Sequence, residues 1–412
     1  MSDWLTPDAL EQAREILQAG PICDECLGRG FAKLGRGLSN ATRGEMLRDA
    51  VSIAAATKRC WVCNGLFEGT DAWAVQGAEL AAGIEFSTYL FGVKLTPRLK
   101  EIEAYRNERF PTEHGGLLKH AFNRLVGLAF EQRVGVGTVD FNDPHISFLV
   151  DLAGDDLSMR IASLYVYGRY RKLVRGIPQT RWPCRRCKGR GCDTCDMTGK
   201  QYPESVEEWI GGALVEAAAG AGHKLHGAGR EDIDARMLGS GRPFILEIVS
   251  PRCRSLDLEA LRDRVNDRAA GRVEVSPLSF VSGSAVGRIK ELDATKRYFA
   301  NIEFEADLTS DQFEGALRSL VGRIDQRTPR RVAHRRADKV RERHVLAISG
   351  ELTDPRHAGV EIEGEGGLYI KELISGDDGR TVPSLAERLD VAARVTELDV
   401  LDVCSDAFEA FE

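Results

Sequence analysis

Several features are absent from this chain of 412 residues, and each absence excludes a class of protein. No run of eighteen apolar residues occurs, so the sequence predicts no transmembrane helix. It also lacks a Walker-type phosphate loop, a Gly-x-Gly-x-x-Gly dinucleotide motif and a His-Glu-x-x-His zinc motif. Nucleotide hydrolysis, dinucleotide chemistry and zinc-protease chemistry therefore have no support in the sequence.

The overall composition is that of a globular protein, with 43% hydrophobic and 29% charged residues. A chain of this length predicts two or three domains. The N-terminal segment lacks the apolar core of a signal peptide, and four Cys-x-x-Cys pairs indicate bound metal rather than disulfides. We therefore expect a cytoplasmic location.

The charge distribution is uneven. The formal net charge is −7, yet residues 160–200 contain eleven Lys and Arg against two acidic residues. Residues 323–343 contain nine against three. Two basic blocks in an acidic chain predict contact with a polyanion, although cations that merely face solvent remain the alternative.

The first two cysteine pairs are separated by a segment expected to be a helix at residues 45–57. Two such pairs fit one tetrahedral zinc site with four thiolate ligands, Cys23, Cys26, Cys60 and Cys63. Two unrelated reduced pairs are the alternative. A thioredoxin-like redox site is disfavoured because no βαβ pattern surrounds either pair.

The other two pairs are closer together, with only four residues between them. This quartet, Cys184, Cys187, Cys192 and Cys195, resembles part of the zinc repeat of DnaJ-type proteins. The short spacing leaves open whether it closes around a second zinc ion.

The remaining pattern predicts an α+β fold. Strands at irregular spacing with returning helices indicate a mixed, largely antiparallel sheet with helices on its face. A strand expected at residues 161–172 ends in cations and tyrosines, so Arg169, Arg171 and Lys172 are predicted to contact RNA. The alternative is an edge strand with packed tyrosines and solvated cations.

Three short motifs carry a family resemblance. Gly229-Arg230-Glu231-Asp232 resembles the Gly-Arg-x-Asp segment of tRNA pseudouridine synthases, and the segments at residues 296–300 and 369–373 resemble two of their later motifs. Longer segments at residues 167–182, 326–338 and 375–381 resemble the archaeal tRNA pseudouridine synthases that modify uridines 54 and 55 of the T-arm. The resemblance covers nearly the whole chain.

This resemblance implies three domains. They are an N-terminal zinc-knuckle region at residues 1–69, a THUMP-like RNA-binding α/β domain at 70–200 that includes the second cysteine cluster, and a pseudouridine synthase catalytic domain at 201–412. The implied partner is the T-arm of tRNA, and the implied enzyme is an isomerase, expected to act as a monomer without a membrane, an organic cofactor or a nucleotide cofactor.

The resemblance also implies roles for individual residues. Asp232 would be the catalytic carboxylate and Lys371 its ion-pair partner, on a strand or strand–helix junction at residues 368–374. Tyr298 and Tyr369 would line the base pocket, and Arg230 would position the turn or a phosphate. The second basic block would contact RNA through Arg330, Arg331, Arg335 and Arg336.

Two other functions remain open from the sequence. One is a non-catalytic, zinc-containing tRNA-binding protein or tRNA-folding chaperone that uses the basic blocks and cysteine knuckles. The other is a metal-dependent protein-binding module of the DnaJ type, disfavoured because the glycine-rich zinc repeat occurs only once.

Overall fold

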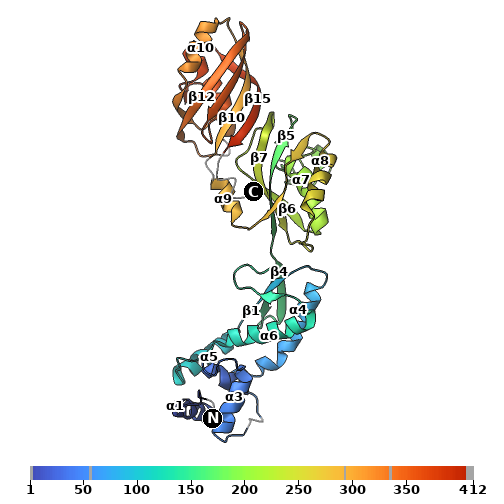
Figure 1. The fold of residues 1–412 in the computed structure, drawn as a ribbon, viewed down its shortest axis with the longest axis vertical. Coiled ribbons are helices and arrows are strands. Elements are labelled where there is room, and N and C mark those ends of the chain that lie inside the picture. The colour runs from blue at the N-terminus through green and yellow to red at the C-terminus, as the bar shows by residue number, and fades with distance from the viewer. Residues whose placement is uncertain (1–2, 55–57, 292–293, 334–335, 405–412) are drawn as a thin grey trace. The chain divides into compact units, whose positions relative to one another are not determined.

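The computed structural model describes residues 3–54, 58–291, 294–333 and 336–404. The chain forms two compact units, Met1–Ala162 and Ser163–Glu412. Both units combine helices and strands, which confirms the predicted α+β class (Figure 1). None of the helices in the described ranges has the length and apolar composition that crossing a bilayer requires.

The first unit begins with a group of helices: α1 (Pro7–Gln18), α2 (Asp24–Gly28), the 3₁₀ helix η1 (Arg29–Phe31) and α3 (Asn40–Ala50). Helix α3 begins earlier than predicted because the Ser39 hydroxyl accepts the Thr42 N–H and caps it at Asn40. Of the helix expected at residues 45–57, positions 51–54 are not helical and 55–57 lie outside the described residues. Cys23 is the N-cap residue of α2, so the first cysteine pair lies at the start of this helix.

The rest of the first unit packs helices on a small sheet. The elements are η2 (Leu66–Gly69), α4 (Thr70–Ala81), α5 (Pro97–Arg109), α6 (Leu118–Val134), β1 (Thr88–Lys94), β2 (Thr138–Val139), β3 (Ile146–Asp151) and β4 (Asp156–Ile161). The strand order is β2-β1-β3-β4, with β1 parallel to β2 and β3, and β3 antiparallel to β4. Phe91 and Phe148 stack across the sheet at 4.4 Å between ring centroids and anchor its core.

The second unit is built on an eleven-stranded sheet. Its strands are β5 (Leu164–Lys172), β6 (Gly222–Gly227), β7 (Ala235–Val249), β8 (Val273–Val275), β9 (Ser279–Val281), β10 (Thr295–Phe304), β11 (Gly322–Arg327), β12 (Val340–Asp354), β13 (His357–Gly364), β14 (Thr381–Val382) and β15 (Ala393–Cys404). The main order is β14-β11-β12-β13-β10-β15-β7-β5-β8. Among the described strands of this sheet only β15 and β7 pair in parallel, which confirms the predicted, largely antiparallel arrangement.

Helices cover both halves of this sheet: α7 (Val206–Ala218), α8 (Leu258–Ala269), α9 (Ala285–Glu291), α10 (Ser310–Arg318), α11 (Ile370–Ser375) and α12 (Leu385–Leu389), with the 3₁₀ helices η3 (Asp193–Cys195) and η4 (Arg330–Val332). Helices α7 and α8 pack with the strands β6 to β8, whereas α10, α11 and α12 pack with the half that contains β12 and β15 (Figure 1). The β7–β15 junction joins the two halves, and the chain segments beside it form the candidate site.

The strand predicted at residues 161–172 is in fact two strands. Ile161 ends β4 in the first unit, and β5 begins at Leu164 in the second, where it pairs with β7. Residues 163–200 thus belong to the second compact unit, whereas the sequence placed them with the domain at 70–200.

Candidate active site

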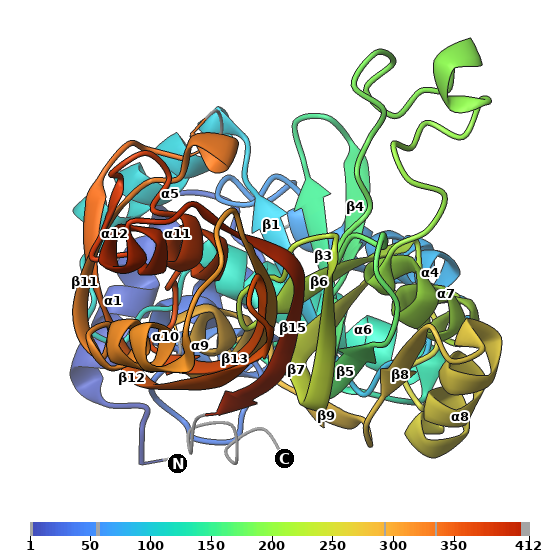
Figure 2. The ribbon, with the colours of Figure 1, turned by 90° about the horizontal axis from the view of Figure 1, so that it is seen from above.

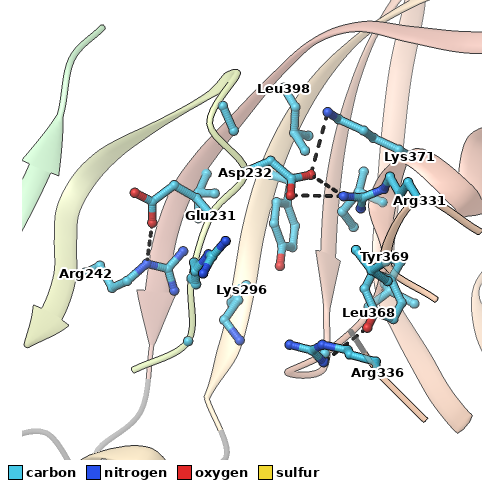
Figure 3. A pocket seen from close by; sticks show the side chains of 18 residues that line it. Glu231, Asp232, Arg242, Lys296, Arg331, Arg336, Leu368, Tyr369, Lys371 and Leu398 are labelled. Atoms are coloured by element: carbon cyan, nitrogen blue, oxygen red, sulfur yellow. Dashed lines mark hydrogen bonds and ion pairs between the residues drawn. The ribbon is translucent and has the colours of Figure 1, made fainter. Parts of the chain in front are cut away.

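A pocket of about 330 Å³ lies beside the parallel β7–β15 junction. Six chain segments line it: the loop at residues 229–234, strand β7 that follows this loop, strand β10, strand β15, the segment at residues 367–371 that leads into helix α11, and the loop that follows β11 (Figure 3). Seven of the residues predicted from the sequence lie on its wall: Arg230, Asp232, Tyr298, Arg331, Arg336, Tyr369 and Lys371. Residues as far apart in the sequence as Arg230 and Lys371, which 141 positions separate, therefore meet in one cavity.

Asp232 lies on the loop before β7, and its side chain is 30% exposed toward the pocket. Arg331 Nη1 lies 3.0 Å from its Oδ1 and 2.9 Å from its Oδ2. Lys371 Nζ lies 3.6 Å from Oδ2. Two cations thus face one carboxylate that remains accessible from the pocket (Figure 3).

The predicted pairing of Lys371 with Asp232 is present, but it is not the closest contact of either residue. Lys371 Nζ lies only 2.6 Å from Asp234 Oδ2, and Arg331 is the nearer cation to Asp232. Burial alone would raise the pKa of Asp234, yet the hydrogen bond and positive charge of Lys371 lower it overall. The prediction of a strand at residues 368–374 is wrong, because residues 370–375 form helix α11, from which Lys371 projects.

Arg331 is fixed by a second carboxylate behind it. Its Nε donates to Glu372 Oε1 at 2.7 Å, and Glu372 is buried. Burial would lower the pKa of Arg331, but its hydrogen bond to Glu372 and the charges of Glu372 and Asp232 raise it, so the guanidinium stays protonated. Sequence reasoning assigned Arg331 to RNA contact and missed this pairing, since 99 residues separate it from Asp232.

The residue next to Asp232 points the other way, into the protein. The Glu231 side chain is fully buried; it accepts the Tyr170 hydroxyl at 2.8 Å and Arg242 Nε at 2.8 Å. Burial and the negative charge of Glu231 raise the pKa of Tyr170. Burial would lower the pKa of Arg242, but the charge of Glu231 raises it overall. No sequence pattern distinguished Glu231 from an ordinary turn residue.

Lys172 completes this buried network. Its Nζ donates to the backbone oxygens of Ile177 at 2.9 Å, Asp232 at 3.1 Å and Ile233 at 3.2 Å, and lies 3.8 Å from Glu231. Burial lowers the pKa of Lys172. The prediction that Lys172 contacts RNA is wrong for this structure, because the side chain is 0% exposed and holds the loop that carries Asp232.

The two predicted tyrosines enclose the pocket from different elements. Tyr298 projects from β10, is 8% exposed, and has its pKa raised to about 12 by burial. Tyr369 precedes α11, and its hydroxyl accepts Arg336 Nη1 at 3.2 Å while its ring lies 5.9 Å from the Arg331 guanidinium. Arg230, beside Glu231, lies over the Trp182 ring at 5.1 Å from its centroid.

The other cations predicted to bind RNA differ in their partners within the protein. Arg169 donates to Ser240, Gly241 and Val403. Arg171 pairs with Glu274, and the exposed Arg330 pairs with Asp378. Arg335 lies outside the described residues. No structural finding tests the RNA contacts of Arg169, Arg171, Arg330 or Arg336, which stay predictions.

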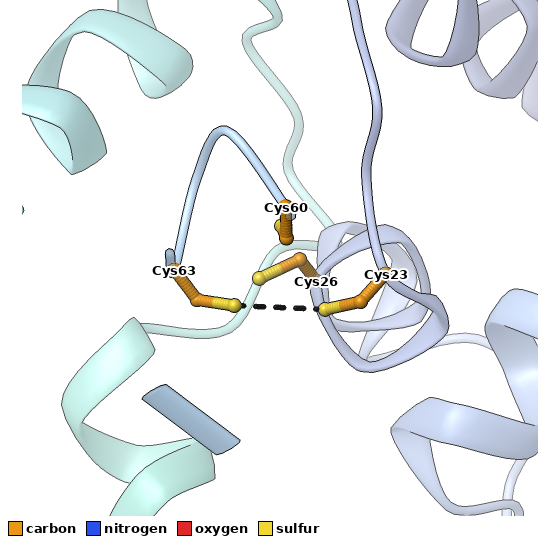
Figure 4. Close-up of side chains that lie close together, drawn as sticks. All are labelled: Cys23, Cys26, Cys60 and Cys63. Atoms are coloured by element: carbon orange, nitrogen blue, oxygen red, sulfur yellow. Dashed lines mark hydrogen bonds between the residues drawn. The ribbon is translucent and has the colours of Figure 1, made fainter. Parts of the chain in front are cut away.

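Both cysteine quartets are assembled in space. In each, four sulfur atoms lie within 4.8 Å of one another. The Cys23 and Cys63 sulfurs are 3.7 Å apart (Figure 4), and the Cys187 and Cys195 sulfurs are 3.8 Å apart. Thiolates that share a tetrahedral zinc at about 2.3 Å lie roughly 3.8 Å apart. The compact second quartet therefore closes as well as the first, and both sets of donors fit a metal ion.

Two family models match this chain. Residues 165–404 match the family model "Pus10, C-terminal", and residues 73–151 match "Pus10 THUMP domain, archaeal". The second match confirms the predicted THUMP domain. A chain of the Cbf5-Nop10-Gar1 complex covers 48% of this chain and 45% of its own length at 18% identity and a TM-score of 0.32, too low to carry an argument.

Two curated archaeal proteins match almost end to end. The "tRNA pseudouridine synthase Pus10" of Halorubrum lacusprofundi is 46% identical, over 96% of each chain. The protein of that name from Methanothrix thermoacetophila is 44% identical, over 97% of this chain and 95% of its own. With this identity over nearly its whole length, and a family model matching more than half of it, the chain belongs to the Pus10 family of tRNA pseudouridine synthases.

Proposed function

We propose that this chain isomerises uridine to pseudouridine in the T-loop of tRNA, at positions 54, 55 or both, with Asp232 as the reacting carboxylate. The observation that carries the proposal is the placement of Asp232. It is an accessible carboxylate at a pocket wall, it faces two cations, and its loop is held from behind by a buried network.

The reaction breaks the bond between N1 of uracil and C1′ of ribose and forms a new bond from C5 to C1′. C5 then loses its proton and N1 takes one up, so the atoms balance. The reaction is redox-neutral, so the chain's own groups suffice. Asp232 acts as a carboxylate in either of two routes, attack on C1′ or removal of the C2′ proton. Arg331 and Lys371 balance the carboxylate charge at 2.9 Å and 3.6 Å while leaving the pocket side open.

The pocket also fits a base that has left its stack. A uridine in a folded T-loop must be extruded before a carboxylate can reach its ribose, which costs a few kcal/mol. Stacking on Tyr298 or Tyr369 and phosphate contacts from the surrounding cations offset that cost. Tyr298 stays a neutral phenol near neutral pH, because burial keeps its pKa at about 12.

The test uses an unmodified tRNA transcript and the full chain without added cofactor. Pseudouridine is mapped by carbodiimide treatment and primer extension, with Asp232→Ala in parallel. We expect stops in the T-loop with the wild-type chain and none with the variant. Transcripts with U54C or U55C assign the position. Tight binding of several tRNAs without any pseudouridine would refute catalysis and support a non-catalytic tRNA-binding protein.

We also propose that both cysteine quartets hold structural zinc, one ion each. The four-sulfur donor sets and their spacing support this. Metal analysis should give two zinc equivalents for the wild-type chain. Cys23→Ser/Cys26→Ser and Cys184→Ser/Cys187→Ser should each give one. Two equivalents in the second variant would refute metal binding by the compact quartet.

The proposed substrate also suggests where and how the chain works. We propose that the chain works in the cytoplasm, as its similarity to tRNA-modifying enzymes suggests. All pocket walls come from one chain, so we propose that it acts as a monomer. Light scattering at the concentration of the activity assay measures the oligomeric state.

A further inference from the structure

The second cysteine quartet forms a small knuckle at residues 183–200, between β5 and α7 in the second unit. Pro183 pairs with Lys200 at its base, where Cys184 N–H donates to the Gly199 oxygen at 2.8 Å. The knuckle's buried apolar cluster consists of its cysteines alone. Figure 2 shows this light green segment extending away from the helices and strands of its unit. Such a segment contributes little to the fold of the catalytic unit.

Its surface is strongly basic. Four exposed cations lie between the first and third cysteines: Arg185, Arg186, Lys188 and Arg190. The structure, which describes every residue of the knuckle, shows no ion pair for any of the four. Arg186 donates to Thr194 Oγ1 at 2.8 Å and Arg190 to the Cys187 oxygen at 3.2 Å, and both acceptors are neutral. These charges remain available to an anionic partner.

The composition of the knuckle favours a nucleic acid over a protein as that partner. Protein interfaces depend on buried aromatic and aliphatic anchors, and the knuckle has no aromatic residue and a single large exposed apolar side chain, Met197. Phosphate contacts depend on clustered Lys and Arg side chains on a fixed backbone. The knuckle meets both conditions, because it carries four clustered cations without an ion pair on a turn that its cysteines hold together.

The stem of the knuckle is bonded to the catalytic loop. Gln179 Nε2 donates to the Gly229 oxygen at 3.0 Å, and the Gly176 N–H donates to the Ile233 oxygen at 2.9 Å. Trp182, just before the knuckle, contacts the Arg230 guanidinium on the same loop. The stem at residues 176–182, which directly precedes the knuckle, therefore holds the loop that presents Asp232.

We propose that the knuckle at residues 183–200 docks on the phosphate backbone of the tRNA whose uridine occupies the pocket. This inference rests on the proposed function for the identity of the substrate. The contact is electrostatic and independent of base sequence, because guanidinium and ammonium groups bind phosphate oxygens. It adds affinity and orients the tRNA without touching the reacting nucleotide.

The test compares two variants that lose the same charge. In the knuckle variant the four cations are neutralised: Arg185→Gln, Arg186→Gln, Lys188→Asn and Arg190→Gln. Asn suits position 188, where φ is +54°. In the control variant four arginines that each pair with a carboxylate are neutralised instead: Arg262→Gln, Arg264→Gln, Arg268→Gln and Arg272→Gln.

Binding of a fluorescent tRNA transcript is measured by anisotropy from 50 to 300 mM salt. We expect the knuckle variant to bind roughly 10- to 100-fold more weakly, with the slope of log K against log salt reduced by about 3 to 4. The control variant should keep the wild-type slope to within about 1. At saturating enzyme the single-turnover rate of the knuckle variant should match that of the wild type.

The proposal is overturned if the knuckle variant binds tRNA with the affinity and salt dependence of the wild type, whether or not pseudouridine forms. If the knuckle variant loses tRNA affinity and the control variant does not, docking is supported. This holds even if the wild-type chain forms no pseudouridine, a result that would refute only the proposed function. Circular dichroism and zinc content check folding. Arg185→Gln/Lys188→Asn is a second variant that removes no side-chain hydrogen bond shown in the structure, and it should give about half the slope change.

Discussion

Glu231 and Asp232 are adjacent carboxylates on one loop, and their surroundings differ completely. Glu231 is fully buried among Tyr170, Arg242 and Lys172, whereas Asp232 faces the pocket with 30% of its side chain exposed. A loop whose backbone is anchored from the protein interior can present a charged group to the pocket without moving when substrate binds. We therefore expect stability to depend on the buried face of the loop and the proposed chemistry to depend on the pocket face.

The largest effect is expected on the pocket face. Asp232→Asn keeps the shape of the side chain but removes its charge, so the single-turnover rate should fall by a factor on the order of 10³ or more. The free energy of unfolding, measured with urea, should change by less than about 1 kcal/mol because the side chain is partly exposed. A large loss of stability would show that Asp232 also supports the loop.

On the buried face, Glu231→Gln should act mainly on stability. It leaves the buried charges of Arg242 and Lys172 without their carboxylate, which costs about 3–5 kcal/mol in the free energy of unfolding. Glu303→Gln, which breaks the more exposed pair with Arg394, is the matched control and should cost less than about 1 kcal/mol. Equal costs in the two variants would contradict the role of the network.

The two cations that face Asp232 should differ in importance. Arg331 is nearer to Asp232 and is fixed by Glu372, so Arg331→Gln should lower the saturated single-turnover rate by about 10- to 100-fold. Lys371→Gln should lower it several-fold less, because its shorter contact is with Asp234. Thermal unfolding of both variants controls for loss of structure. If Lys371→Gln lowered the rate more than Arg331→Gln, the distances to Asp232 would not predict which cation matters more for the reaction.

The smallest effect concerns alkaline pH. Burial raises the pKa of Tyr298 from 10.0 to about 12, so between those values the unfolded chain releases a proton that the folded chain keeps. Tyr298 thus stabilises the fold fully below pH 10, and this contribution of about 2–3 kcal/mol is lost as pH rises through 12. Urea unfolding at pH 9, 10 and 11 should show a shallower decline for Tyr298→Phe. An unchanged slope would contradict the assignment.

Much of the local structure could be predicted from the sequence. Thr6 caps α1 with Pro7 at its first position, and Thr309 caps α10 through the Gln312 N–H. Residues 146–151 alternate between buried and more exposed positions in β3. These features depend on hydrogen bonds and side-chain alternation over a few residues, so a short stretch of chain contains the information. The break between Ile161 and Leu164 was missed because only Ala162 and Ser163 separate the two strands, and neither glycine nor proline marks the change of unit.

The candidate site was predictable in part. The motif resemblance led to Asp232, Tyr298, Tyr369 and Lys371, and the structure places all four on one pocket. Only Lys371 was predicted as the ion-pair partner of Asp232, and the nearer Arg331 was missed, since contacts across 99 residues have no local pattern. Lys172 was assigned to RNA contact because it ends a strand with cations and tyrosines, whereas three backbone acceptors and Glu231 surround it in the structure.

The sequence by itself determined the α+β class, the two sets of four cysteines, the two basic blocks and the motif that contains Asp232. Each depends on residue type and spacing along the chain. The tertiary structure alone decided which cations face Asp232, which side of the loop is buried, and that the compact cysteine quartet closes. The first two outcomes depend on the pairing of β7 with β15 and on the desolvation of charges at their junction, which bring together groups far apart in the chain. The third depends on backbone turns within residues 184–195 that bring the four sulfur atoms together.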